Sequence, residues 1–439
     1  MHSKLINSGM TQRMASFLLL GMAILHILST VWPQIPAWLS GLAGWLAFLL
    51  LFLSQPTQFK LFLALAGTGL FLLLCGWWLG NPPSIEKILL QNNGLIVMLY
   101  CISYLTLLTT PTQAIEKTLP TGRLSAVKTL FGVYLMGSFI NASILVLVGE
   151  RFRKTGDVTR QSTTLTGRAF SMAALWSPFF GAMAVALTYS PEATLYSLMA
   201  VGIPLAMIGI IYTLIDLGGN KLHMLQDFKG YPMQADSLWV PALLACSVII
   251  GHQLWPDVSI LVIISAAAIG LTIAFLLAKR SQETKQQLHQ HVRNSAPLKA
   301  RELGLFLGAG LLSVGAQAVF ASFSDFHPFT SVSGVLLSVL LAGSIGLSIA
   351  GIHPVVTISV LGPLLTPLQG DPNMIAVFYL CMWSLGTVAS PFSGTNVIMR
   401  SQFGASGGEL FRWNIGYVVF MWMVVSAMFM IWNGHVVFQ

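Results

Sequence analysis

The sequence predicts an all-α polytopic membrane protein with about eleven transmembrane helices and two re-entrant hairpins, arranged as inverted-topology repeats. Of its 439 residues, 55% are hydrophobic and only 8% are charged, and the mean hydropathy is +0.77. Soluble domains carry about 25% charged residues, so this composition excludes a soluble fold. Apolar runs of roughly 18–25 residues recur along the chain without the alternation of a barrel, and each could cross a bilayer as a helix.

Eleven of the apolar runs have the form of simple spans. The first is expected to be a transmembrane helix and not a signal peptide, because no small-residue cleavage site follows it. The expected domains are a first span (1–36), repeat 1 (37–216), a cytoplasmic linker (217–236) and repeat 2 (237–439). The expected spans are residues 14–31, 37–54, 61–80, 86–109, 163–189, 195–215, 237–254, 258–278, 304–322, 373–400 and 411–433.

The run 126–149 predicts a hairpin that enters and leaves the membrane on the cytoplasmic side. Basic residues such as Lys128 and Arg151 flank both of its ends, and short basic loops favour the cytoplasm. Small and polar residues, including Gly137 and Asn141, lie near its middle. Such a turn is tolerated at membrane depth only inside protein or beside a cavity. The hairpin with its end is expected over residues 126–150.

The run 331–366 predicts a second hairpin, which enters from the outside. It is too long for one helix across a bilayer, and Gly351 and Pro354 interrupt it. The flanking segments 322–328 and 366–371 contain no Lys or Arg. This second hairpin therefore has the opposite orientation to the first.

The distribution of basic residues predicts the orientation of the chain. With a cytoplasmic N-terminus and a periplasmic C-terminus, every one of the 22 Lys and Arg residues except Lys87 lies on the cytoplasmic side. The net charge of +8 is thereby assigned to loops and indicates no nucleic-acid partner. The sequence predicts a multi-pass protein of the bacterial inner membrane, whose partners are the lipid bilayer and a small solute.

A pentad, Ser-Pro-Phe-x-Gly, occurs once in each half of the chain, at residues 177–181 and 390–394. Asn141 precedes the first pentad by 36 residues, and His353 precedes the second by 37. Each pentad follows a predicted hairpin and lies inside a predicted span. Inverted repeats with interrupted helices are a common plan of secondary transporters.

The pentads predict polar sites in the middle of the bilayer, because Pro and Gly break the hydrogen bonds of a helix. Helix N-termini attract anions, and freed carbonyls with Ser, Thr and Asn oxygens suit sodium. The second pentad is richer, since Thr395 and Asn396 follow it and Ala182 and Met183 follow the first. The candidate solute- or ion-binding residues are Asn141, Ser143, Ser177, His353, Thr357, Ser390, Ser393, Thr395 and Asn396. Of these, the candidates for sodium are Asn141, Ser390, Thr395 and Asn396.

Charged residues are expected to be absent from the middle of the spans. Proton-coupled carriers often use buried carboxylates, so this absence favours sodium as the coupling ion. No other cofactor or metal is expected.

The pattern resembles the ion transporter superfamily, and most closely its divalent anion/sodium symporter branch. Members carry Ser-Asn-Thr at their hairpin tips, and the matching regions here read Ile-Asn-Ala-Ser at 140–143 and Gly-Ile-His-Pro at 351–354. Their interrupted helices carry a Gly-Thr-Pro-Pro-Asn-like turn, to which the segment 393–396 is similar. The resemblance covers nearly the whole chain by topology and two short regions per half by motif.

The resemblance implies an elevator-type carrier, expected to form a homodimer. Both hairpins and the spans 163–189 and 373–400 would form a moving transport domain. Spans such as 86–109 and 304–322 would form a scaffold.

The sequence therefore predicts a sodium-coupled secondary transporter of a small organic or inorganic anion, and not an enzyme. One alternative is an exporter of a metabolite, siderophore or toxic oxyanion on the same fold. Another is a membrane enzyme acting on lipid-linked substrates, which needs a catalytic cluster in a loop. Its candidates are His289 and His291 in the loop 278–302.

Overall fold

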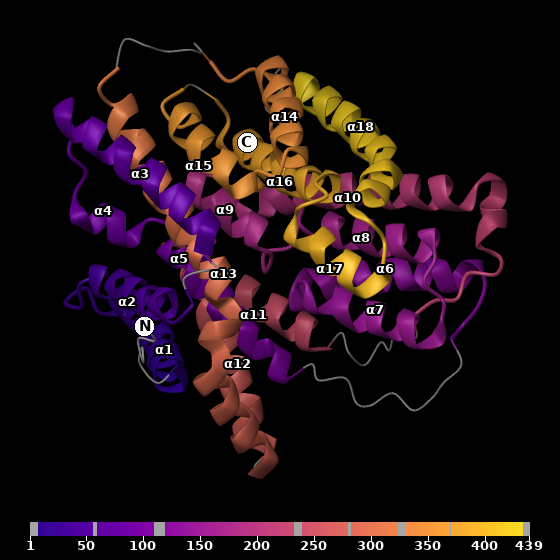
Figure 1. Ribbon diagram of the computed structural model, residues 1–439, viewed down its shortest axis with the longest axis horizontal. Helices are drawn as coiled ribbons and strands as arrows, with labels where there is room; N and C mark the ends of the chain where they lie inside the picture. The colour runs from indigo at the N-terminus through magenta and orange to yellow at the C-terminus, as the bar shows by residue number, and fades with distance from the viewer. Residues whose placement is uncertain are drawn as a thin grey trace, which may run out of the picture. The chain divides into compact units, whose positions relative to one another are not determined.

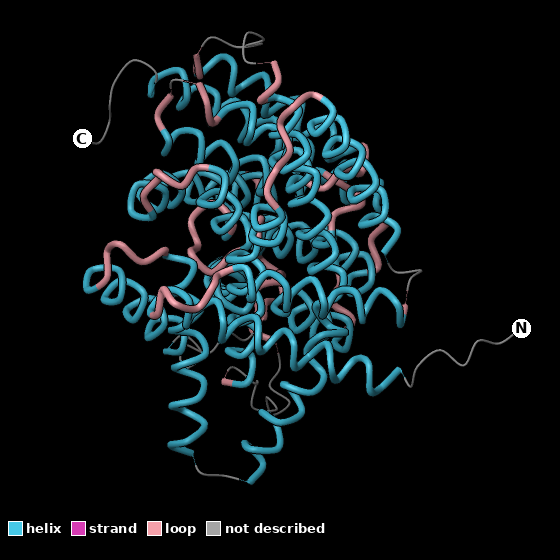
Figure 2. The backbone as a smooth tube through the Cα atoms, turned by 90° about the vertical axis from the view of Figure 1, so that its left-hand side faces the viewer, coloured by secondary structure: helices cyan, strands magenta, loops and turns pink. Residues whose placement is uncertain are grey.

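The computed structural model describes residues 8–55, 59–108, 119–231, 239–279, 282–323, 331–368 and 370–432. Most of these residues form helices, and an isolated antiparallel bridge joins Thr121 to Lys229. Figure 2 shows the helices in cyan with short pink connections between them. The prediction of an all-α fold is confirmed.

Eight helices in the described part of the chain are long and apolar enough to cross a membrane, as expected of a multi-pass membrane protein. They match eight of the eleven predicted spans. The other three predicted spans are the shorter helices α2 (Trp38–Ser54) and α11 (Trp239–Leu254), and the interrupted pair α8 (Arg160–Ala173) and α9 (Gly181–Tyr189). The eight long segments are Gly9–Val31, Lys60–Trp78, Ile85–Leu107, Leu195–Gly218, Ile260–Ala278, Lys299–Phe320, Pro372–Phe403 and Gly407–Trp432.

Packing divides the chain into two compact units. Unit 1 comprises residues 1–110, 242–328 and 362–364, and unit 2 comprises residues 111–241, 329–361 and 365–439. Each of the two sequence repeats contributes to both units, so the units and the repeats divide the chain differently. The described part of the predicted linker 217–236 includes the 3-10 helix η3 (Asn220–Leu225). Residues 232–236 of the linker and most of the flank 322–328 lie outside the described residues.

Unit 1 is a bundle in which α1 packs on α2, α3 on α13 and α5 on α12. Small residues bring the backbones of α3 and α13 close together: a Cβ added at Gly315 would lie 2.6 Å from the carbonyl oxygen of Gly69. The bounds are α1 (Ser8–Val31), α3 (Lys60–Trp78), α4 (Ile85–Leu90), α5 (Asn93–Ile102), η2 (Ser103–Leu107), α12 (Ile260–Lys279) and α13 (Gln282–Phe320).

Unit 2 contains the same order of elements twice: a helical hairpin, an interrupted helix and a long continuous helix (Figure 1). The first set is the hairpin α6 (Arg123–Ile140) and α7 (Ser143–Thr155), the interrupted pair α8 and α9, and α10 (Leu195–Gly218). The second set is the hairpin α14 (Gly334–Ile349) and α15 (Pro354–Leu365), the interrupted pair α16 (Pro372–Ala389) and α17 (Gly394–Phe403), and α18 (Gly407–Trp432).

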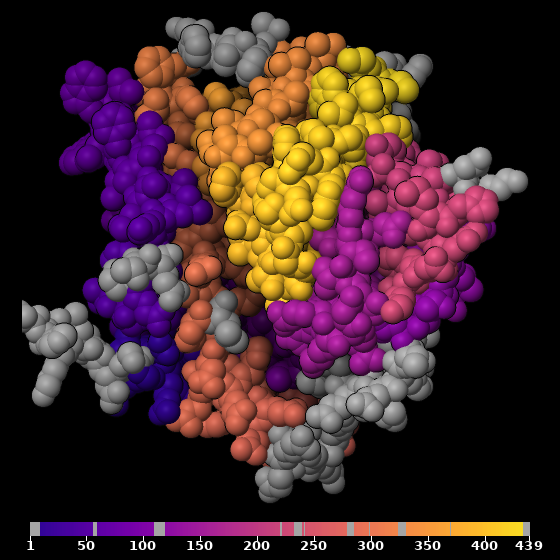
Figure 3. Space-filling model, turned by 45° about the vertical axis from the view of Figure 1, so that its right-hand side comes forward, coloured from indigo at the N-terminus to yellow at the C-terminus, as the bar shows by residue number. Residues whose placement is uncertain are grey.

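The two sets pack against each other within unit 2. Helix α7 of the first hairpin packs on α17, and a Cβ added at Gly149 would lie 2.5 Å from Gln402. In Figure 3 the yellow C-terminal segment lies directly against the magenta segment of the first half. Both hairpins and both helix breaks therefore belong to one packed body.

Local sequence fixes where the interrupted helices begin. Thr159 and Ser162 form a reciprocal capping box at the start of α8. Asp371 accepts hydrogen bonds from the backbone N–H groups of Asn373 and Met374, and Pro372 occupies the first turn of α16. The first helix of each interrupted pair therefore begins at a residue whose side chain caps its N-terminus.

Candidate functional site

The two interrupted helices meet at Ser171 of α8 and Ser384 of α16. The Ser171 hydroxyl donates to the Ser384 carbonyl oxygen at 2.6 Å, and the Ser384 hydroxyl donates to the Ser171 carbonyl oxygen at 2.9 Å. Each serine lies six residues before the serine of its own pentad. The repeated motif is therefore longer than the pentad and reads Ser-x5-Ser-Pro-Phe-x-Gly.

The first break, between α8 and α9, is closed by the first hairpin. The hydroxyl of Ser177 donates to the carbonyl oxygen of Ser138 in α6 at 2.5 Å, and its oxygen accepts from the N–H of Phe179 at 3.2 Å. The ring of Phe179 lies 5.0 Å from that of Phe139. Ser177 and Phe179 are both fully buried. The hydrogen bonds of Ser177 are thus made within the protein.

The second break, at residues 390–393, is held by its own side chains. Ser393 donates to the Thr387 carbonyl oxygen at 2.7 Å and caps the N–H of Asn396 at 3.1 Å. The side-chain amide of Asn396 donates to the carbonyl oxygens of Ser390 at 2.8 Å and Val388 at 3.2 Å. Carbonyls freed by the break are therefore partly satisfied by Ser393 and Asn396, so these two candidates have a structural role.

Three oxygen atoms at the second break keep capacity for a ligand. The Ser390 oxygen accepts from the N–H of Phe392 at 3.3 Å, but its proton has no acceptor among the described residues. The half-buried Thr395 hydroxyl and the side-chain oxygen of Asn396 likewise have no hydrogen-bond partner in that part of the chain. Hydroxyl and amide oxygens of this kind can bind a hard cation such as sodium.

The tip of the first hairpin carries a strained asparagine. Asn141 has φ 51° and ψ −143°, a conformation that favours glycine. Its half-buried side chain makes no hydrogen bond within the described residues, and Ser143 at the start of α7 is exposed. Both polar side chains are therefore free to meet a ligand.

The tip of the second hairpin lies beside α16. His353 accepts a hydrogen bond from the N–H of Val355 at 3.2 Å, and its ring lies 5.1 Å from that of Trp383. A Cβ added at Gly386 would lie 2.9 Å from Pro354, the first residue of α15. One turn beyond His353, the Thr357 hydroxyl oxygen is buried without a partner in the described part of the chain.

The structure thus brings each break together with its own hairpin. Ser177 contacts the first hairpin directly, and the second hairpin lies beside the helix that ends at Ser390. No hydrogen bond among the described residues joins a candidate side chain of one half to a candidate of the other.

The fold is similar to that of a known transporter. It matches the crystal structure of the Alcanivorax borkumensis YdaH transporter, described as having an unusual topology, with a TM-score of 0.50 and 15% sequence identity. The match covers 85% of this chain and 98% of that one. No family model and no curated protein matches the sequence.

A buried cation, Arg168, lies in α8, near the start of the predicted span 163–189. Arg168 is 1% exposed and forms an ion pair with Asp216 of α10 at 2.7 Å. It also donates to the side-chain oxygen of Asn414 at 3.0 Å and to the carbonyl oxygen of Trp413 at 2.6 Å, and it lies 5.0 Å from the ring of Tyr417. All three guanidinium nitrogens are bonded, so Arg168 joins α8, α10 and α18. In the sequence, the one indication of this buried ion pair is an Arg within the apolar run 163–189.

The two histidines on which the enzyme alternative depends do not form a common site. Exposed His289 contacts Arg293 at 3.1 Å, whereas His291 contacts the Ser103 hydroxyl at 3.2 Å and the Tyr104 ring at 4.5 Å. They therefore have separate partners.

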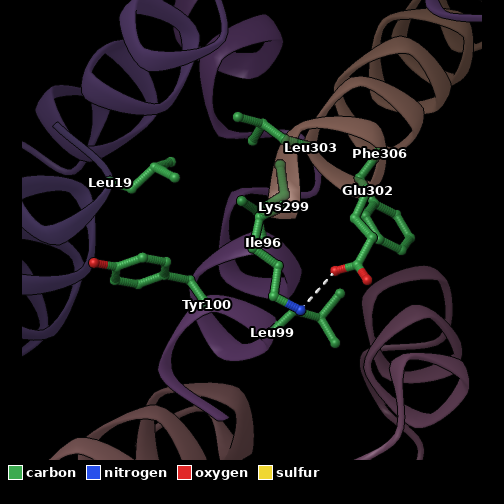
Figure 4. A pocket seen from close by; sticks show the side chains of 8 residues that line it. All are labelled: Leu19, Ile96, Leu99, Tyr100, Lys299, Glu302, Leu303 and Phe306. Carbon is green, nitrogen blue, oxygen red and sulfur yellow. Dashed lines mark hydrogen bonds and ion pairs between the residues drawn. The ribbon is translucent and has the colours of Figure 1, made fainter. Parts of the chain in front are cut away.

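Unit 1 has a pocket of its own, and none of the nine candidate residues lines it (Figure 4). Its lining is mainly apolar, with one ion pair of 3.0 Å between Lys299 and Glu302. The lining residues are Leu19, Ile96, Leu99, Tyr100, Lys299, Glu302, Leu303 and Phe306.

Proposed function

We propose that this protein is a secondary active transporter that moves a small anionic solute across the inner membrane, coupled to sodium. One observation carries the proposal: two hairpins and two helix breaks, repeated in the same order, lie in one compact unit, except for residues 362–364 of the second hairpin. Non-helical backbone at membrane depth needs a protein or water-filled environment. Repeated breaks beside hairpins are the arrangement in which transporters bind their substrates.

The second break is the proposed binding site. Ser390, Thr395 and Asn396 offer oxygen atoms for sodium, with Asn141 as a further candidate. The first two N–H groups of α17 precede its first intrahelical hydrogen bond, from Val397 to Ser393, and can face an anion. Sodium beside this helix end would strengthen the attraction for the anion. The first break, whose serine is already bonded, has a supporting role.

The proposed mechanism is an elevator. Unit 2 holds both breaks and would carry the solute as a single body, and unit 1 would be the stationary frame of a homodimer. The bonds between Ser171 and Ser384 support this division, because they join the two interrupted helices. Cross-linking in native membranes tests the dimer.

Transport by the purified protein in liposomes tests the function. An inward sodium gradient should drive uptake of an anion from a panel of carboxylates, sulfate and phosphate, and an equal potassium gradient should not. Thr395→Val removes one proposed sodium oxygen while keeping the side-chain shape, and should raise the sodium concentration for half-maximal uptake about tenfold, the effect of about 1.4 kcal/mol.

Thr188→Val is the matched control. The Thr188 hydroxyl donates only to the Ala184 carbonyl oxygen of its own helix at 2.7 Å. This variant should keep the sodium dependence of the wild type. Uptake of no anion, or uptake indifferent to sodium, would count against the proposal. Comparing right-side-out with inverted vesicles separates import from export.

A further inference from the structure

The third residue of the pentad has opposite environments in the two halves. Phe179 is 1% exposed in the first break, and Phe392 is 62% exposed in the second. Both residues occupy the same position of the motif, and both N–H groups donate to the pentad serine. The difference therefore comes from what the hairpins place against the two rings.

The first hairpin covers its phenylalanine and the second does not. Phe139 lies against Phe179 with the ring centres 5.0 Å apart. At the second hairpin, Gly351 lies beside the Phe392 ring: it has φ 103°, and its added Cβ would lie 3.4 Å from that ring. A glycine supports the ring from one side and leaves the remainder uncovered. The next residue, Ile352, is itself 39% exposed.

An exposed phenylalanine in a membrane protein usually faces lipid, but its position argues against that here. Phe392 lies in the non-helical segment between α16 and α17, inside the apolar stretch Pro372–Phe403. Irregular backbone does not face lipid within the hydrocarbon region. The open side of Phe392 must therefore face a water-filled space or protein. Gly394, two residues further along, is exposed, and beyond its chain neighbours and the backbone of its own helix no described atom lies within 4 Å of the position its Cβ would take.

We infer that Phe392 and Ile352 form an apolar wall of the solute site, and that the solute is an organic anion with a ring or branched hydrocarbon body. Its carboxylate would lie at the N–H groups of Gly394 and Thr395, and its hydrocarbon would pack on the open face of Phe392. A fully hydrated inorganic oxyanion would gain nothing from such a wall. The inference rests on the proposed function and narrows its solute class.

Thermal stabilisation of the purified protein in sodium buffer tests the inference, with benzoate, cyclohexanecarboxylate, acetate and sulfate as probes. The two ring carboxylates should stabilise the wild type at concentrations at least about tenfold below those needed for acetate or sulfate. Phe392→Ala should weaken the apparent affinity for the ring carboxylates about tenfold and leave that for acetate unchanged. Phe392→Leu should give an intermediate loss of affinity for the ring carboxylates. This variant can be tested if Phe392→Ala does not fold.

Phe71→Ala is the control, because Phe71 is 64% exposed in α3 of unit 1 and lies far along the chain from the pentads. It should change none of the four affinities. Equal stabilisation by acetate, sulfate and the ring carboxylates would overturn the inference and leave the proposed function standing. So would a Phe392→Ala variant that weakens all four probes equally. If neither these four anions nor any other anion stabilised the protein, the proposed function itself would be contradicted.

Discussion

Ser171 and Ser384 occupy the same position in two copies of one motif, and each donates its hydroxyl proton to the carbonyl oxygen of the other. This contact is symmetric, because the same atoms of the two motif copies bond to each other. It joins α8 to α16 within unit 2. The match between the halves is therefore a property of their packing as well as of their sequence.

Replacing these two serines should show strong coupling between them. Ser171→Ala and Ser384→Ala should each lower the free energy of unfolding by about 1 kcal/mol, and the double variant should lose clearly less than the sum. Unfolding of the detergent-solubilised protein in a double-mutant cycle measures this. Ser344→Ala is the control, since the Ser344 hydroxyl bonds locally to Leu341. Strict additivity would contradict a direct pair.

The two pentad serines should separate stability from transport. Ser177→Ala removes a buried bond to the Ser138 carbonyl and should cost about 1 kcal/mol of stability. Ser390→Ala removes a hydroxyl whose proton has no acceptor in the described residues, and should leave stability nearly unchanged while weakening sodium-driven uptake. Thermal unfolding and uptake are measured on both variants. The reverse pattern would show that the first break binds the ion.

Arg168 should be essential for the stability of unit 2. Arg168→Met would leave Asp216 and Asn414 without their partner and should destabilise the protein by about 3–5 kcal/mol. Asp216→Asn should cost less, because the side chain of Asp216 is 31% exposed. Expression level and thermal unfolding report the difference. Wild-type stability in Arg168→Met would show that the cluster is dispensable.

Asn141→Gly should relieve strain at the tip of the first hairpin. A glycine adopts φ 51° without the cost of about 1 kcal/mol or more that a side chain brings there, so stability should be unchanged or raised. If Asn141 is a sodium ligand, the same variant should require more sodium for uptake. Thermal unfolding and sodium titration of uptake give the two values. A stabler variant with unaltered sodium dependence would remove Asn141 from the site.

His291 should make the stability of unit 1 sensitive to mild acid. It lies in α13 before the spanning segment Lys299–Phe320. Burial, followed by the positive charge of Lys299, lowers the pKa of His291 from 6.5 to about 4. The unfolded chain therefore binds a proton first as the pH falls, so stability is full above about pH 6.5 and decreases toward pH 4.

Thermal unfolding between pH 7 and pH 4 measures this dependence. His291→Gln should flatten the profile, and His289→Gln, at an exposed position on the same helix, should not. An unchanged profile in His291→Gln would assign the acid sensitivity to other groups.

Composition and charge were enough to predict the helical membrane fold, the eleven apolar segments and the positions of both hairpins. A chain of this hydropathy can cross a bilayer only as helices, and residues that break helices mark where the helices are interrupted. The pentads located both breaks for the same reason. The sequence could not show which polar side chains bond within the protein and which remain available to a ligand, because that depends on contacts between distant segments.

Three residues illustrate this limit. Asn396 was predicted as a ligand, but its amide group also satisfies carbonyls of the break. Ser384 and Ser171 share a position six residues before their pentads, but the sequence alone does not show that the two side chains meet. Arg168 was grouped with the cytoplasmic loops, although Asp216 makes its burial possible.

The contact between Ser171 and Ser384 has the geometry of an isologous dimer interface, in which a surface meets its own copy. Here both copies belong to one polypeptide, so a mutation alters one side and leaves the other as it was. The reciprocal serine contact can be retained while the two breaks diverge. Asn396 stands where the first half has Met183, and the two pentad phenylalanines have opposite exposures. Fusion of the halves into one chain thus permits an asymmetric site inside a symmetric frame.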